Sequence, residues 1–235
     1  MGRPDRIHQE ASLTDDVYYQ LKDYLLSDII RPPERIQIGQ LSKHFTVSIT
    51  PIREALIRLA TEGIIELKPG RGFFYKDFLP AEQIRLYELI YCVLHHVIRS
   101  SGPRSPIRFL YDQSSMSQPG SDGATLRSSV AIKEKLLEQI AMSSGNDEFV
   151  GLIRSLCERT RISRILDLQH RENAATIFGG LKALVAALRD GKDGLAIDIL
   201  KEQIDGKRAR MQMLAEERSR RIYAANPLLR PGAGR

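Results

Sequence analysis

The apolar positions near the start of the chain follow a helical pattern that begins at residue 14. They recur at helical spacing on one face: Val17, Leu21, Tyr24, Leu25 and Ile29. Residues 1–13 are polar and aperiodic, so we expect a loose arm there. The Arg-Pro-Pro run at 31–33 predicts the end of this helix, because proline disfavours helical backbone in the residue before it.

Two further helices are predicted between residues 41 and 63. Leu41 and Phe45 are the i,i+4 apolar pair of a short helix, and a tight turn follows at 46–47. A third helix begins within 48–51, where either hydroxyl can cap it and proline suits the first turn. Its core face consists of Ile52, Ala55, Leu56 and Leu59. Gly63 closes it, since glycine accepts the left-handed backbone found at helix ends.

A β-hairpin follows the third helix. Two β-rich runs, 64–67 and 73–76, flank a Pro-Gly turn. The turn presents Lys68 and Arg71, cations suited to a minor groove or a phosphate backbone. Three helices and a hairpin within about 60 residues predict a winged helix-turn-helix.

The rest of the chain reads as all-helical, so the predicted fold class is mainly α. An N-terminal winged helix-turn-helix, residues 1–77, precedes a C-terminal antiparallel helical bundle, residues 78–225, and a loose tail, residues 226–235. Residues 100–123 are rich in Ser, Gly and Pro and read as a long loop. Helices are predicted at 80–100, 125–144, 147–169, 173–189 and 194–225.

Charge does not by itself indicate a nucleic-acid partner. The chain has 35 basic and 29 acidic residues, a net charge of +6. Residues 1–77 hold 11 of each sign and are neutral, whereas residues 207–235 hold eight basic and two acidic residues. The basic excess therefore describes the end of the chain, which reads as a solvated helix end.

Several classes of protein are excluded by what the sequence lacks. No apolar run approaches the roughly 18–20 residues that cross a bilayer, and no secretory signal is visible, so we expect a cytoplasmic protein without membrane contact. No glycine-rich phosphate loop, nucleophile elbow or paired-histidine zinc motif occurs. We therefore expect neither an enzyme nor a bound cofactor. Helical spacing places Cys92 on one face with either His95 or His96. These residues could form a soft metal or redox site, but we favour the interpretation that they are ordinary helix side chains.

The side of the third helix opposite its core face carries residues suited to duplex DNA. It presents Ile49, Thr50, Arg53, Ile57 and Thr61. Such a helix fits the major groove, where side chains near its N-terminus meet base edges and phosphates. Arg53 can contact guanine or a phosphate, and Ser48 and Thr50 lie where hydroxyls hold a phosphate. Arg53 and Glu54 could instead form a solvated helix face, but the order of the surrounding elements favours DNA binding.

The run VSITPIREALIRLATEGIIELKPGRGFF resembles the DNA-binding domain of GntR-family transcriptional regulators, and the likeness spans residues 14–77. The resemblance implies DNA-contacting or wing positions for six residues: Ser48, Thr50, Arg53, Lys68, Arg71 and Gly72. The family usually has arginine after the serine, and this chain has Ile49. One base or phosphate contact is therefore missing, or an apolar contact such as one to a thymine methyl group replaces it.

The helical remainder resembles the FCD-type ligand-binding domain of the FadR subgroup, in the stretches IAMSSGNDEFVGLIRSL and LKALVAALRDGKDGLAIDIL. The resemblance implies a divalent metal held by aspartate and histidines, with an arginine that grips a carboxylate effector. The corresponding positions here are Lys133, Leu137, Leu181, Gln203 and, for the arginine, Ile90. These residues lack suitable donors, so we expect a metal-free cavity that apolar side chains fill or that takes a more apolar ligand.

Together these patterns predict a sequence-specific DNA-binding transcriptional regulator. The resemblance favours a repressor, because repression is the commoner outcome in the family. A homodimer would bind an inverted-repeat operator, and a small-molecule effector would modulate it. The alternative is a winged-helix protein with no small-molecule effector, regulated by a protein partner or by its own abundance. An enzyme, or an adaptor that binds RNA, remains a further class.

Overall fold

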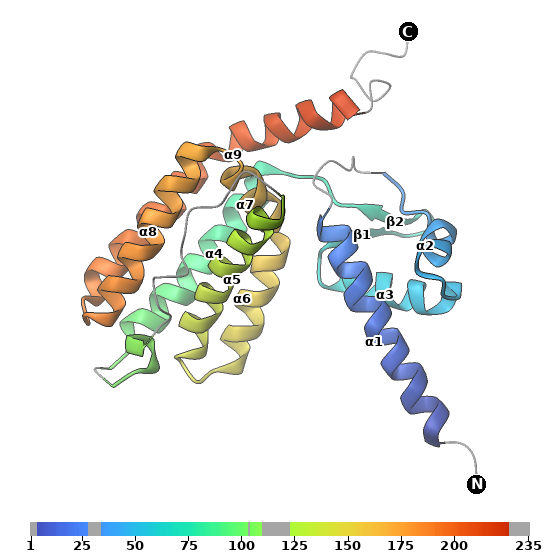
Figure 1. Ribbon diagram of the computed structural model, residues 1–235, viewed down its shortest axis with the longest axis horizontal. Helices are drawn as coiled ribbons and strands as arrows, with labels where there is room; N and C mark the ends of the chain where they lie inside the picture. The colour runs from blue at the N-terminus through green and yellow to red at the C-terminus, as the bar shows by residue number, and fades with distance from the viewer. Residues whose placement is uncertain (1–3, 28–33, 103, 110–122, 226–235) are drawn as a thin grey trace. The chain divides into compact units, whose positions relative to one another are not determined.

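The computed structural model describes residues 4–27, 34–102, 104–109 and 123–225, with twelve elements of helix and strand (Figure 1). The chain divides into two compact units. The N-terminal unit comprises residues 1–77 together with 221–235, and the helical unit comprises residues 78–220. The described helices include none that is both long enough and apolar enough to cross a membrane.

The N-terminal unit begins with a longer helix than the sequence predicts. Helix α1 runs over Pro4–Ser27, so the loose arm expected for residues 1–13 is wrong from residue 4 onward. Proline is tolerated in a first helical turn, and residues 5–13 contain no glycine or proline that would interrupt the helix. Because this stretch is polar, the spacing of apolar residues could not reveal the helix. The predicted Arg-Pro-Pro stop lies outside the described residues.

Helices α2, Ile38–Phe45, and α3, Ile49–Thr61, confirm the predicted helix-turn-helix. The turn between them places Thr46 in the left-handed region, at φ 56°, and its N–H bonds back to α2. Ser48 holds the N-cap position of α3, but its hydroxyl makes no capping bond, which corrects that expectation. Gly63 has φ 74° and ends the α3 turn as predicted.

The wing is a two-stranded antiparallel hairpin of β1, Ile65–Lys68, and β2, Gly72–Tyr75. Gly70 and Gly72 adopt φ of 70° and 98°, a region that favours glycine. Residues 34–36 add backbone pairing along β2: Ile36 N–H donates to Phe73 O at 2.8 Å, and Tyr75 N–H donates to Glu34 O at 3.0 Å. The segment before α2 therefore anchors the wing, which the sequence did not predict.

One apolar core joins α1, α2, α3 and the wing. The predicted face of α3 is buried throughout: Ile52, Ala55, Leu56 and Leu59. It packs against Val17, Tyr18, Leu21 and Leu25 of α1 and against Phe73 and Tyr75 of β2. The opposite face of α3 is thereby held outward.

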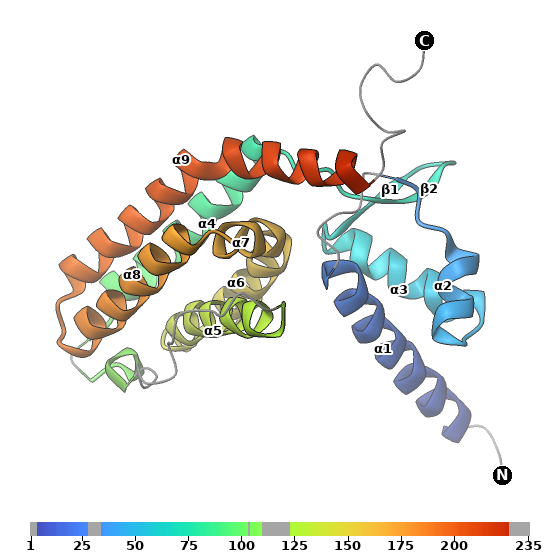
Figure 2. The ribbon, with the colours of Figure 1, turned by 45° about the horizontal axis from the view of Figure 1, so that its top comes forward.

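The helical unit contains six helices and a single 3-10 turn among its described residues. They are α4 Pro80–Arg99, η1 Pro106–Phe109, α5 Gly123–Met142, α6 Asp147–Arg159, α7 Arg161–Leu168, α8 Arg171–Arg189 and α9 Asp193–Ala225, whose last residues count with the N-terminal unit. Helices α4, α5 and α6 pack side by side, and α7 contacts α5 and α8 (Figures 1 and 2). The predicted fold class, winged helix-turn-helix plus helical bundle, is confirmed.

The single helix predicted for 147–169 is wrong, because Thr160 divides it into α6 and α7. The backbone of Thr160 leaves the helical region, at φ −105° and ψ 6°, and its fully buried hydroxyl donates to Leu156 O at 2.6 Å. Every residue of 163–168 is buried. The helical spacing of apolar residues continues through Thr160, so the sequence pattern did not reveal the break between the two helices.

Part of the loop predicted for 100–123 is ordered structure. Ile107 of η1 is fully buried, and Arg108 makes a bidentate ion pair with Asp193 at 2.6 and 2.9 Å. Arg108 also donates to Leu188 O at the end of α8, at 2.8 Å. Residues 103 and 110–122 lie outside the described residues.

Substitutions of neighbouring residues on the two faces of α3 should differ in how much they change the free energy of unfolding. Leu56 has no exposed surface, and we expect Leu56→Ala to lower the free energy of unfolding by about 2–5 kcal/mol, since it leaves a cavity in the core. Ile57 is 48% exposed, and Ile57→Ala should change it by less than about 0.5 kcal/mol. Urea unfolding followed by circular dichroism measures both. Equal losses would contradict the assignment of the two faces.

Candidate DNA-binding surface and the bundle interior

The outer face of α3 is open to solvent along a line of three residues, Ile49, Arg53 and Ile57, which we call the outer strip. Their i,i+4 spacing aligns them on one side of the helix. Ile49 is 51% exposed and Ile57 is 48% exposed, and Arg53 is exposed between them. Ser48 and Thr50, at the start of α3, are exposed as well. The structure thus brings all five predicted α3 residues to one surface.

Arg53 is held by no other part of the protein that the structure describes. It makes no hydrogen bond or ion pair with a described residue, and Glu54 instead accepts from Thr14 at 3.4 Å. Arg53 and Glu54 are both exposed, as the alternative of a solvated helix face also requires, so exposure alone does not decide between that alternative and DNA binding. Thr61, at the far end of the face, donates its hydroxyl to Ile57 O at 3.0 Å. The guanidinium of Arg53 is available to a ligand.

A polar clamp, which the sequence did not predict, holds α1 against α3. It consists of Tyr18, Lys22, Arg58 and Glu62. The Tyr18 hydroxyl donates to Glu62 at 2.6 Å, Lys22 donates to Glu62 at 3.0 Å, and the Arg58 guanidinium lies 3.7 Å from the Tyr18 ring centroid. Burial and Glu62 raise the pKa of Tyr18 above its usual value, so the hydroxyl stays protonated. The clamp and the core together fix α3 on α1.

The wing cations lie around an aromatic ring. The Lys68 ammonium is 4.7 Å and the Arg71 guanidinium 5.7 Å from the centroid of Phe74, and Lys68 also pairs with Glu66 at 3.3 Å. Arg71 is exposed and Lys68 half-buried. A side chain at Gly72 would approach Arg35 Nε to 3.3 Å, so Gly72 makes room for Arg35. Arg35 is a wing cation that sequence reasoning missed, because it precedes α2 and lies far from the hairpin in the sequence.

In the helical unit, the positions aligned with the FCD metal ligands do not fit a metal ion. Ile90, Leu137 and Leu181 are buried apolar side chains. Lys133 is a cation, and the half-buried Gln203 packs over Gly180. Within the described ranges no three His, Cys, Asp or Glu side chains lie close enough to share an ion. Apolar side chains therefore occupy three of these positions, whereas the charges of Asp167, Lys207 and Arg164 lie near Lys133.

The most buried charge is Asp167 on α7, which has no exposed surface. Its carboxylate accepts from Lys207 at 2.8 Å, from Arg210 at 2.9 and 3.0 Å, and from Asn173 at 2.8 Å. Burial alone would raise the pKa of Asp167, but Lys207 and Arg210 outweigh it and hold that pKa at about 2. Lys207 and Arg210 belong to the basic segment that the sequence suggested was solvated. That interpretation is wrong for Lys207, which is buried.

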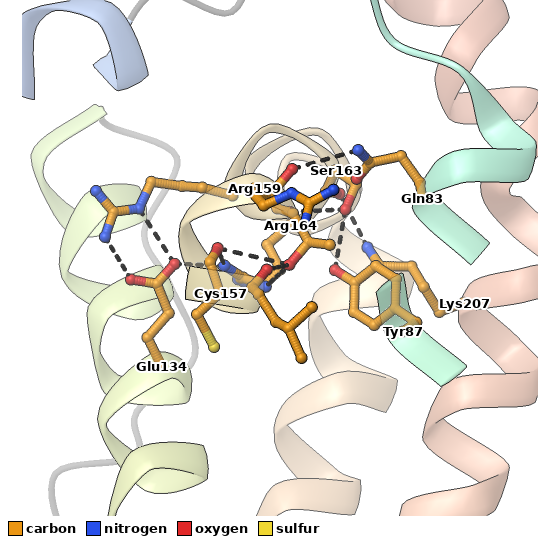
Figure 3. A network of polar contacts seen from close by, with 11 residues as sticks. Gln83, Tyr87, Glu134, Cys157, Arg159, Ser163, Arg164 and Lys207 are labelled. Atoms are coloured by element: carbon orange, nitrogen blue, oxygen red, sulfur yellow. Dashed lines mark hydrogen bonds and ion pairs between the residues drawn. The ribbon is translucent and has the colours of Figure 1, made fainter. Parts of the chain in front are cut away.

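A second carboxylate, Glu134 of α5, is shared by two arginines (Figure 3). Arg164, only 1% exposed, donates to Glu134 at 2.5 Å and to Thr160 Oγ1 at 2.7 Å. Arg161 donates to the same carboxylate at 2.6 and 3.1 Å. Burial would raise the pKa of Glu134, yet the two arginines lower it overall. Arg164 Nε keeps no partner although it is buried.

A hydrogen-bonded chain links this region to α4 and α9. Tyr87 and Ser163 share a hydrogen bond of 2.9 Å between their oxygens, and Lys207 donates to Ser163 O at 2.9 Å (Figure 3). Neither carboxylate is left for Lys133, which makes no hydrogen bond or ion pair with a described residue. Burial, together with the nearby charges of Lys207 and Arg164, lowers the pKa of the half-buried Lys133 to about 8, against the opposing effects of Tyr87 and Asp167. Four cations thus share the carboxylates of Glu134 and Asp167, and Lys133 is a fifth cation near them: the four are Arg161, Arg164, Lys207 and Arg210.

The considered cysteine–histidine site is not assembled among the described residues. Cys92 and His96 are exposed, His96 stacks edge-on against Phe149 with ring centroids 5.5 Å apart, and His95 lies beside Tyr91. These contacts fit ordinary helix side chains.

Comparison with known proteins identifies the family. Residues 13–74 match the model of the bacterial regulatory proteins of the gntR family. The Nta operon transcriptional regulator of Aminobacter aminovorans is 32% identical over 148 residues, which cover 60% of this chain and 68% of that protein. The chain belongs to the GntR family. It is therefore a DNA-binding helix-turn-helix transcriptional regulator rather than an enzyme, as the sequence predicted.

Two further likenesses extend this result. The HTH-type transcriptional repressor RspR of Escherichia coli is 27% identical to this GntR-family chain over 77 residues, 33% of this chain and 34% of that protein. A solved GntR structure from Rhodococcus sp. RHA1 matches this chain with a TM-score of 0.67 and 18% identity. The match covers 86% of this chain and 98% of that protein. That likeness concerns the fold alone, and it bears out a winged helix-turn-helix followed by an all-helical C-terminal domain.

The unpaired charge of Lys133 leads to a prediction about stability. Lys133→Met should raise the free energy of unfolding at pH 7 by about 1 kcal/mol or more, because it removes a desolvated charge that lacks an anionic partner. Between pH 8 and pH 10.5, the unfolded lysine holds a proton that the folded one has lost, so the wild type gains stability as pH rises. The advantage of the variant should therefore shrink across this window.

Urea unfolding at several pH values between 7 and 10.5 measures this difference. Lys135→Met, at an exposed position on the same helix, is the control and should show no such trend. A variant less stable than the wild type at pH 7, or an advantage independent of pH, would contradict the prediction.

Proposed function

We propose that this GntR-family chain acts as a homodimer that binds an inverted-repeat operator in duplex DNA and represses transcription. The unpartnered guanidinium of Arg53, exposed on the outer strip of α3, is the observation that carries this proposal. A buried or ion-paired arginine would have to exchange partners to bind DNA, whereas this one is already available. The presence of a similar Escherichia coli protein named as a repressor supports the direction of control.

The proposed contacts divide between bases and phosphates. Ile49, Thr50, Arg53 and Ile57 face the major groove, with Arg53 donating to guanine O6 and N7. Ser48 at the N-terminus of α3 holds a phosphate, where the helix dipole and free N–H groups favour an anion. Lys68 and Arg71 contact the flanking backbone or minor groove, and Gly72 gives the wing the conformation that presents them. The remaining residues of the unit position these side chains.

The dimer follows from the small size of one winged helix. One such module offers few base contacts, and paired half-sites related by the protein's two-fold axis are the usual remedy. The helical unit, residues 78–225 in the proposed division, would form the dimer and set the spacing of the half-sites. We propose the bacterial cytoplasm as the place of action, because the operator DNA lies there.

Selection of duplexes from a random pool by the full-length protein tests this proposal. We expect enriched inverted repeats whose half-site centres lie about 10 base pairs or a multiple of that apart, and a dimer in sedimentation at micromolar protein. Single-stranded RNA of random sequence is the control for an adaptor function and should not compete. A monomer with and without DNA, or enrichment of single sites, would overturn the dimer.

Arg53 and Arg71 should differ in how they affect binding. Arg53→Ala should weaken binding to the selected operator by about 1–3 kcal/mol and relax the preference at one position of each half-site. Arg71→Ala should weaken all duplexes alike and reduce the dependence of affinity on salt, since it removes a phosphate contact. Fluorescence anisotropy at matched salt concentrations measures both. Wild-type affinity and salt dependence in both variants would refute these contacts.

A specific observation favours an anionic effector in the helical unit. Among the described residues Lys133 has no anionic partner, because four other cations already donate to the carboxylates of Glu134 and Asp167. A desolvated cation of this kind is stabilised most by an anion that enters beside it. Arg164 Nε adds a buried donor without a partner. We therefore propose a small carboxylate or phosphate compound as the effector, bound by Lys133 without a metal ion.

Thermal unfolding in the presence of small carboxylates and inorganic phosphate tests the effector. A compound that binds should raise the melting temperature of the wild type and of Lys135→Met, and leave that of Lys133→Met unchanged. Melting curves with and without a chelator should coincide, since no metal ion takes part. If none of these anions shifts the wild type, the alternative without a small-molecule effector is favoured.

A further inference from the structure

Two aliphatic side chains stand on the outside of α3 although the same helix has a well-packed core face. Ile52, Leu56 and Leu59 have no exposed surface, whereas Ile49 and Ile57 are 51% and 48% exposed. Exposed aliphatic residues that occur singly need no explanation. In the outer strip each of the two lies four residues, just over one helical turn, from Arg53, which pairs with no described residue. They therefore share the surface proposed to enter the major groove.

The chemistry of an isoleucine side chain limits what it can meet in that groove. It carries no hydrogen-bond donor or acceptor, so beside guanine, adenine or cytosine it would remove water from polar base edges without replacing the lost bonds. The C5 methyl group of thymine is the one apolar group that the major groove presents. Contact with that methyl group buries apolar surface on both partners.

We infer that Ile49 and Ile57 are specificity-determining residues that read thymine methyl groups on either side of the base pair contacted by Arg53. This inference rests on the proposed operator binding through α3. The two isoleucines are eight positions apart in the chain, about 12 Å along the helix, so they reach different base pairs. Ile49, the first residue of α3, makes the stronger contact, because N-terminal residues of a recognition helix lie nearest the base edges.

Replacement of thymine by deoxyuridine tests the inference, because it removes the methyl group and leaves every hydrogen bond of the base pair in place. The probe is the tightest duplex selected from a random pool by the full-length protein, with each thymine replaced in turn. We expect wild-type affinity to fall about three- to fivefold at one or two thymines of each half-site, the effect of losing one buried methyl group. The other replacements should leave affinity unchanged.

Variants assign the effect to the isoleucines. In Ile49→Ala the thymine and deoxyuridine duplexes should bind equally well at the most sensitive position, and Ile57→Ala should remove the effect at the second position if two occur. Both residues are about half exposed, so melting temperatures should match the wild type. Leu195→Ala, an equally exposed leucine on α9 in the helical unit, is the matched control and should keep the full discrimination.

The outcomes separate this inference from the proposed function. If no duplex is enriched, the operator proposal itself fails. If an operator is enriched but tolerates deoxyuridine at every thymine, operator binding stands and the inference is overturned. If discrimination persists unchanged in both isoleucine variants, another residue reads the methyl group, and the assignment to Ile49 and Ile57 is overturned.

Discussion

An ionised carboxylate with no exposed surface is tolerated only where donors from the protein replace the water it has lost. Asp167 satisfies this condition through Lys207 and Arg210 of α9 and Asn173 of α8, so one charge ties α7 to both neighbouring helices. Glu134 does the same between α5 and α7 through Arg161 and Arg164. The arrangement of the helical unit depends on this exchange of hydration for ion pairs.

In the N-terminal unit, one helix, α3, is held in place by contacts on a single face. The apolar side of α3 packs into the core with α1, and the Tyr18–Glu62 clamp adds directional contacts along the same join. The outer side then presents, between two aliphatic residues, an arginine that pairs with none of the described residues. An exposed cation of this kind is suited to the phosphates and guanine edges of DNA.

The departures from the family pattern are consistent with one another. Where the resemblance implies a metal and its ligands, this chain has Lys133 and the buried apolar residues Ile90, Leu137 and Leu181. A lysine supplies positive charge without the coordination chemistry of a metal ion, and burial lowers its pKa. On α3, Ile49 stands where the family usually carries arginine, so an apolar side chain replaces a cationic one. Both changes alter the chemistry that the family pattern would supply at these positions.

Local patterns in the sequence determined the winged helix-turn-helix, the core face of α3, the exposed residues of the outer strip and the all-helical remainder. They did so because apolar periodicity and turn residues are properties of adjacent positions. The extension of α1 to Pro4, the break at Thr160 and the pairing of residues 34–36 with the wing were decided by contacts or by backbone geometry that periodicity does not encode. The charge network was likewise invisible, since Glu134, Arg164, Asp167 and Lys207 come from distant segments. Only the tertiary structure brings these charges together, because burial, which makes each of them require a partner, arises when the helices pack.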